Sequence, residues 1–118
     1  MNGPDQGFGK CRRLRRKSEI DAVFASSSKV SSGGMAIRYA VREPGCSRVA
    51  IITGKRWGNA VERNRLRRIA REVFRKWHCP EAYSVDVVVS QYRSFKNVPG
   101  SQVARVIGEL LGMIRKQL

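Results

Sequence analysis

The stretch "KRWGNAVERNRLRRIAREVF", residues 55–74, decides the fold, because apolar residues recur in it at the spacing of a helix. Asn59 is a favourable N-cap residue, so the pattern predicts a long helix from there to about Trp77. On a helical wheel of about 100° per residue, one side carries Leu66, Ile69, Ala70, Val73, Phe74 and Trp77. We expect that side to pack on a sheet.

The opposite side of this predicted helix is basic. It carries Arg63, Asn64, Arg67, Arg68, Arg71 and Arg75, with Arg65 and Lys76 on a flank. Like charges three or four residues apart on a helix repel, so such a stripe costs stability unless an anion lies on it. The planar fork of Arg fits phosphate oxygens bidentately and stacks on exposed bases, which suits RNA. The stripe is therefore a predicted RNA-binding surface, with a merely solvated charged face as the alternative.

The charge of the whole chain also indicates a polyanionic partner. The 118 residues include 24 Lys and Arg against 9 Asp and Glu, a formal net charge of +15. A net charge of about 2 to 8 already keeps a small domain in solution, so solubility does not explain this excess. A membrane surface is a poorer partner, because the apolar side of the helix is needed for the core. We expect a flexible tail at residues 1–9 and a single RNA-binding domain at residues 10–118.

Several features predict a cytoplasmic protein without a metal site. The sequence has no apolar run long enough to span a membrane, and its basic N-terminal stretch is not followed by the apolar region of a signal peptide. Cys11, Cys46 and Cys79 are odd in number and lack C-x-x-C spacing, which favours reduced thiols. His78 and Cys79 are adjacent, but no second pair of zinc ligands accompanies them.

The rest of the chain predicts an α/β (α+β) two-layer sandwich with a mixed central sheet of three to four strands. The expected elements are a helix at about 19–26 capped by Ser18, strands at 35–42 and 48–54 in a hairpin, the basic helix, a strand at 83–90 and a final helix capped by Ser101. "SSSKVSSGG", residues 26–34, is expected to be a loop. The order is thus helix, strand, strand, helix, strand, helix.

The run "GKRWGNAVERNRLRRIAREVF", with "RNR" at residues 63–65, closely resembles the signature of the protein subunit of bacterial ribonuclease P. The resemblance extends without gaps from about Arg48 to Phe74, and "LRRKSEIDAVF" and "RYAVREP" are similar to the first helix and first strand of that family. The resemblance implies an α/β sandwich with a left-handed strand-helix-strand crossover, an exception to the usual right-handed rule.

The resemblance also implies a function. The partner RNA subunit carries the catalytic centre and requires Mg²⁺, and the protein helps it to bind precursor tRNA and remove the 5′ leader. The implied RNA-subunit contacts are Lys55, Arg56, Arg63, Asn64, Arg65, Arg67, Arg68 and Arg71. The implied leader-binding cleft, between the sheet and the first helix, contains Ile20, Phe24 and Tyr39. Ile20 departs from the aromatic residue usual there, and core packing is the alternative role for the two aromatic residues.

The sequence predicts no catalytic residue in this chain. It has one His, and Glu62 and Glu72 lie ten residues apart, too far along one helix to form a carboxylate metal site. We therefore expect the protein alone not to cleave RNA, and we expect neither DNA nor a membrane as a partner. The alternative function is that of a ribosomal-type protein that scaffolds a large RNA and has no role in processing.

Overall fold

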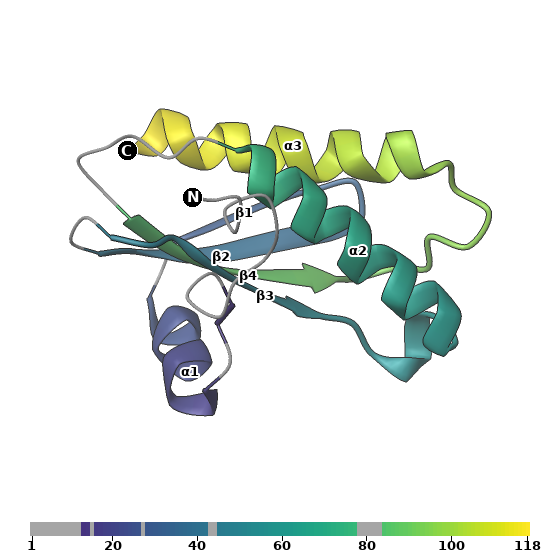
Figure 1. Cartoon of the computed structure of the whole chain (residues 1–118), viewed down its shortest axis with the longest axis horizontal. Coiled ribbons are helices and arrows are strands. Elements are labelled where there is room, and N and C mark those ends of the chain that lie inside the picture. Colours follow the sequence, from purple (N-terminus) through teal and green to yellow (C-terminus); the bar gives the residue numbers. More distant parts are fainter. Residues whose placement is uncertain (1–12, 15, 27, 43–44, 78–83) are drawn as a thin grey trace, which may run out of the picture.

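A computed structural model describes residues 13–14, 16–26, 28–42, 45–77 and 84–118. The predicted tail at 1–9 and three residues discussed above, Cys11, His78 and Cys79, lie outside the described residues. The elements are α1 (Lys17–Ala25), β1 (Lys29–Ser32), β2 (Met35–Arg42), β3 (Arg48–Ile52), the 3-10 helix η3 (Lys55–Trp57), α2 (Ala60–Lys76), β4 (Ser84–Gln91) and α3 (Gly100–Gln117) (Figure 1).

The four strands form one mixed sheet in the order β1-β2-β4-β3, which confirms the predicted sheet. β2 is antiparallel to β1 and β4, whereas β3 is parallel to β4. The predicted hairpin between β2 and β3 is wrong, because β4 lies between them. β4 is buried from Ser84 to Ser90 on both faces, as expected for an inner strand of a sheet that is covered on both sides.

The predicted loop at residues 26–34 is also wrong, since it contains β1. This strand pairs with β2 through a tight turn at Gly33 and Gly34, whose φ angles are 59° and 88°. Both values lie in the left-handed region that glycine adopts without strain, as a two-residue hairpin requires. The strand carries one buried apolar residue, Val30, so it has too little alternation to be recognised in the sequence.

Helices cover both faces of the sheet. α2 and α3 lie on one face, and α1 lies across the other (Figure 1). The predicted apolar side of α2 is confirmed, because Leu66, Ala70 and Phe74 are buried in the main core. Along most of β2 and β4, every second residue belongs to that core. The residues between them point to the opposite face of the sheet, which α1 covers.

The predicted start of α2 is confirmed. Asn59 Oδ1 accepts a hydrogen bond from Glu62 N at 2.9 Å, and Glu62 Oε1 accepts one from Asn59 N at 2.9 Å. This reciprocal pair is a capping box, which satisfies two backbone donors at the helix end. Gly58 makes room for it, since a Cβ there would lie 3.0 Å from the Cβ of Glu62.

The predicted N-caps of the other two helices are wrong. α1 begins after Arg16 and α3 after Pro99, and neither Ser18 nor Ser101 is the cap residue. The backbone explains both starts: N–H groups of the first turns already donate to the carbonyl oxygens of Arg16 and Pro99. Each serine therefore lies inside the first turn of its helix and not at the N-cap position.

A cluster of charged side chains ties α1 to the sheet. Asp86 on β4 is 5% exposed, and Arg48 of β3 donates to it from Nε (2.9 Å) and Nη2 (2.7 Å). Arg42 forms a further ion pair with the same carboxylate at 2.9 Å. Arg48 Nη1 also donates to Glu19 of α1 at 2.6 Å. The bond to Asp86 raises the pKa of Arg48, and the bond from Arg48 lowers the pKa of Glu19.

We expect Arg48→Met to lower the free energy of unfolding by about 3 kcal/mol, because it leaves the buried carboxylate of Asp86 with only Arg42 as a partner. Urea denaturation measures the change. Arg105→Met, on the exposed side of α3, removes the same charge and should change stability by less than about 0.5 kcal/mol. Equal stability of the two variants would show that Asp86 does not need Arg48.

Candidate nucleic-acid interface

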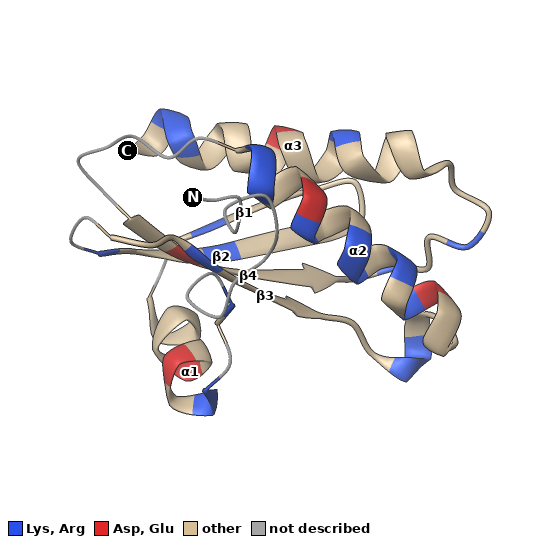
Figure 2. Cartoon of the chain, in the orientation of Figure 1, with Lys and Arg blue, Asp and Glu red and all other residues tan. Residues whose placement is uncertain are grey.

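Basic residues recur along α2 (Figure 2). Asn64 and Arg68 are exposed, and Arg63, Arg67 and Arg71 are half-buried. Arg67 Nη1 donates to Asn64 Oδ1 at 3.0 Å, while none of these arginines forms an ion pair with a carboxylate of a described residue. Their positive charge is therefore available to an external anion.

Two arginines at the C-terminal end of α2 differ in their surroundings. Burial, followed by the charges of Arg13 and Arg67, lowers the pKa of Arg71. Arg75 instead donates to Glu72, and this bond raises its pKa. Arg75 belongs to the predicted stripe in position, but its charge is already compensated. A phosphate bound at Arg71 would offset the repulsion between the neighbouring arginines. At Arg75 the positive charge is already paired with Glu72, so a phosphate would bind there less favourably.

A groove of about 290 Å³ opens beside Arg71. Leu14 N donates to Val49 O at 2.9 Å and so places the segment at residues 13–14 along the edge strand β3. The groove is lined by Arg13, Leu14, Ile20, Val49, Ala50, Ile51, Ile52 and Arg71. It thus combines two guanidinium groups with an apolar floor, an arrangement suited to a phosphate and an unpaired base.

The basic surface continues at η3, which precedes α2. Lys55 and Arg56 are exposed, and the guanidinium of Arg56 lies 4.9 Å from the ring centroid of Trp57. Stacking on the indole restrains the guanidinium without consuming its hydrogen-bond donors. Both residues therefore fit the predicted contact surface.

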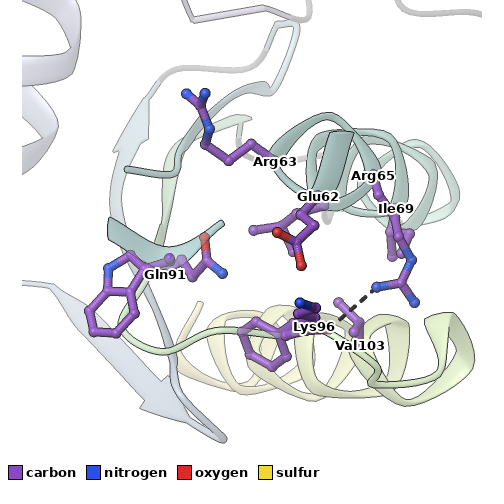
Figure 3. Close-up of a pocket in the computed structure, with 10 residues that line it drawn as sticks. Glu62, Arg63, Arg65, Ile69, Gln91, Lys96 and Val103 are labelled. Atoms are coloured by element: carbon purple, nitrogen blue, oxygen red, sulfur yellow. Dashed lines mark hydrogen bonds between the residues drawn. The ribbon is translucent and has the colours of Figure 1, made fainter. Parts of the chain in front are cut away.

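Arg65 points elsewhere. Its Nη2 donates to Val98 O at 2.5 Å and its Nη1 to Phe95 O at 3.5 Å, so it holds the loop between β4 and α3. Figure 3 shows Arg63 and Arg65 leaving α2 in different directions around a cavity of about 10 Å³. The helical wheel correctly put Arg65 on a flank, but carbonyl acceptors in a distant loop leave no periodic signal in a sequence.

We expect Arg65→Ala to loosen the β4–α3 loop, because two carbonyl oxygens lose a charged donor. The amide of Val98, which donates to Phe95 O, reports on this loop. Its hydrogen exchange should become about tenfold faster. Arg68→Ala, which removes an exposed arginine of the same helix, should leave that rate unchanged. A rate unaffected by Arg65→Ala would contradict the anchoring role.

The three residues predicted for the leader cleft do not meet. Ile20 and Phe24 lie on α1, where Ile20 packs with the smaller core and Phe24 is 37% exposed. Tyr39 is 5% exposed in the main core on the other face of the sheet, and its hydroxyl donates to Gln117 Oε1 of α3. Its predicted place in a cleft beside α1 is wrong, because it shares the face of β2 that carries Ile37.

Sequence reasoning missed Arg38, which does face α1. Its guanidinium carbon lies 5.3 Å from the ring centroid of Phe24. The alternation of β2 was the available signal, since it places Arg38 and Tyr39 on opposite faces. The residue that accompanies Phe24 is thus a cation and not a second aromatic ring.

The described part of the chain offers no group of three or more His, Cys, Asp or Glu side chains placed to hold a metal ion. Among the same residues, no helix combines the length and the apolar character needed to cross a membrane.

The mixed sheet and the uncompensated basic side of α2 define a small α+β RNA-binding domain. The sequence model of the family Ribonuclease P matches residues 8–115, so the chain belongs to the ribonuclease P protein family. It is thereby a protein component of an RNA-based endoribonuclease, whose partners are the ribonuclease P RNA and precursor tRNA.

Relatives and solved structures agree with this assignment. The chain is 30% identical to the ribonuclease P protein component of Petrotoga mobilis, over 94% of this chain and 95% of the relative. It is 36% identical to that of Dehalococcoides mccartyi, over 85% and 82% of the two chains. Its fold is similar to the RNase P protein from Thermotoga maritima, with a TM-score of 0.69 and 25% identity over 88% of this chain and 96% of that one. The Staphylococcus aureus RNase P protein gives a TM-score of 0.77 at 20% identity, over 88% and 95%.

Proposed function

We propose that this chain binds the catalytic RNA subunit of ribonuclease P and the 5′ leader of precursor tRNA, and so promotes endonucleolytic removal of the leader. The observation that carries the proposal is the outer side of α2, where arginines lie without carboxylate partners among the described residues. The catalytic centre, with its Mg²⁺, then belongs to the RNA. The cytoplasm is the expected location.

The first proposed surface binds the RNA subunit. It consists of Lys55, Arg56, Arg63, Asn64, Arg67, Arg68 and Arg71, on η3 and the outer side of α2. Arg65 does not belong to this surface, because it donates to Val98 O in the β4–α3 loop. Phosphate contacts position a protein on structured RNA without reading its sequence, which suits a row of guanidinium groups.

The second proposed surface binds the single-stranded leader on the α1 face of the sheet. Phe24 supplies an exposed ring, and Ile20 supplies apolar contact beside the groove. Stacking on an aromatic ring is worth about 1–3 kcal/mol per base and tolerates any base. It therefore suits an enzyme whose substrates carry leaders of many sequences.

A ribosomal-type scaffold is the competing function, since a basic helix on a small domain serves that purpose equally. A scaffold has no need of the exposed Phe24 ring beside Arg38. Adding the protein to refolded bacterial ribonuclease P RNA at low Mg²⁺ separates the two. We expect it to restore cleavage of precursor tRNA, and no effect on cleavage would favour the scaffold.

Removing Arg67 and Arg71 together should flatten the salt dependence of binding to the RNA subunit. Each lost phosphate contact is expected to remove roughly 0.7 to 0.9 from the slope of log K against log salt. Arg75→Ala is the matched control on the same helix, because its guanidinium is paired with Glu72 and its slope should change little. An unchanged slope in Arg67→Ala/Arg71→Ala would refute phosphate binding by α2.

Phe24→Ala should weaken binding of precursor tRNA to the reconstituted holoenzyme by about 1–3 kcal/mol, the value of one stacked base, and leave mature tRNA unaffected. Tyr39→Phe is the control, since it removes only the hydroxyl that bonds to Gln117 on the far face of the sheet. Equal losses for precursor and mature tRNA in a folded Phe24→Ala variant would exclude this face as the leader site.

A further inference from the structure

Three arginines of the sheet face α1, and two of them are fully engaged. Arg48 bonds to Asp86 and Glu19, and Arg42 pairs with Asp86 and donates to Cys46 O at 2.7 Å. Arg38 has no hydrogen bond or ion pair with any residue that the structure describes, and its Nε is buried without a partner. Its positive charge is therefore not compensated by any described residue.

The register partners of Arg38 in the sheet supply no carboxylate, and the nearby Asp86 is already paired with Arg42 and Arg48. The register partner on β1 is Lys29, and the partner on β4 is the buried Val88. Opposite charges on directly opposed residues stabilise a sheet, and Arg38 faces a like charge on one side and an apolar residue on the other. This placement costs stability in the free protein and is relieved when an anion binds.

The ring of Phe24 fixes the direction from which that anion must come. The guanidinium carbon lies 5.3 Å from the ring centroid, so the ring shields one side of the fork. Because Nε is buried, the terminal N–H groups are the donors left for an anion. Since Phe24 is 37% exposed, a base can stack on its ring while the adjoining phosphate reaches the fork. Ile20, the other α1 residue of this surface, has no ring and cannot take part in such a stack.

We propose that Arg38 binds a phosphate of the single-stranded RNA that stacks on Phe24. This proposal rests on the proposed leader-binding function and assigns to that surface a charged residue in addition to its aromatic one. A guanidinium accepts a phosphate bidentately at any position of any sequence, so Arg38 adds affinity for a strand without selecting its bases. The pair thereby recognises one whole nucleotide unit.

The test uses the holoenzyme reconstituted with refolded bacterial ribonuclease P RNA, and compares precursor with mature tRNA. Arg38→Met keeps the apolar stem and removes the fork, and we expect it to weaken precursor binding about tenfold without affecting mature tRNA. Arg38→Lys keeps the charge without the fork and should recover only part of the loss. Arg105→Met, on the exposed side of α3, is the control of equal charge and should bind both RNAs normally.

Precursor tRNAs in which single leader phosphates are replaced by neutral methylphosphonates locate the contact. One position should weaken binding to the unaltered protein and have no further effect in Arg38→Met. If no position behaves in this way, or if the loss follows the base and not the phosphate, Arg38 is not a phosphate ligand.

Phe24→Ala separates this proposal from the function on which it rests. Discrimination between precursor and mature tRNA that is lost in Phe24→Ala but retained in Arg38→Met overturns the role of Arg38 and leaves the leader surface in place. Discrimination retained in both variants overturns both proposals. If Arg38→Met weakens the binding of precursor and mature tRNA equally, and its stability to urea is unchanged, the proposed role of Arg38 is also overturned. The contact would then lie outside the leader.

Discussion

The buried carboxylate of Asp86 is the constraint on which the rest of the structure depends. β4 is one of the two inner strands and is buried on both faces, yet it carries this one charge. A lone charge in that position would be prohibitive, so Arg48 and Arg42 must approach it from the strands on either side. The pairing of β4 with both β3 and β2 is thereby linked to charge neutralisation. Because Arg48 also holds Glu19, the same cluster fixes α1 on the sheet.

The few acidic residues of the chain separate structural arginines from available ones. Asp86 and Glu19 engage Arg42 and Arg48, and Glu72 engages Arg75. Glu62 completes the capping box of α2. Several arginines have no carboxylate partner among the described residues, and they include those on the outer side of α2 and Arg38 beside Phe24. In a chain of net charge +15, the position of each carboxylate therefore says more about function than the position of each arginine.

Features encoded within one segment, such as α2, were predicted well from the sequence. Pairings between distant segments were not. Asn59 and the apolar period of α2 lie within one segment, so both the start of that helix and its buried side follow from the residues themselves. The partner of β3 is β4, more than thirty residues away, and adjacency in the chain wrongly favoured β2. The left-handed crossover between β3 and β4 stays a prediction from the family resemblance. No local pattern in the sequence encodes the handedness of a crossover.

The same distinction explains the candidate site. The basic side of α2 follows from a helical wheel, but the carbonyl oxygens that engage Arg65 lie in a loop about thirty residues on. Tyr39 was assigned by resemblance in spite of the alternation of its own strand, which places Arg38 and not Tyr39 beside α1. Where a family assignment conflicted with the alternation of the strand, the alternation identified the residue that faces α1.

The groove beside β3 joins the two proposed RNA surfaces. Arg71 reaches it from α2, and Ile20 reaches it from α1 on the opposite face of the sheet. An RNA subunit on α2 and a leader on the α1 face are therefore neighbours around one sheet edge, within a domain whose longest extent is 38 Å. Once the RNA subunit is bound, the leader of a precursor tRNA docked on that subunit meets its surface at a high effective concentration. Under the proposed function, weak, sequence-independent contacts at Phe24 then suffice, because the leader does not have to be captured from free solution.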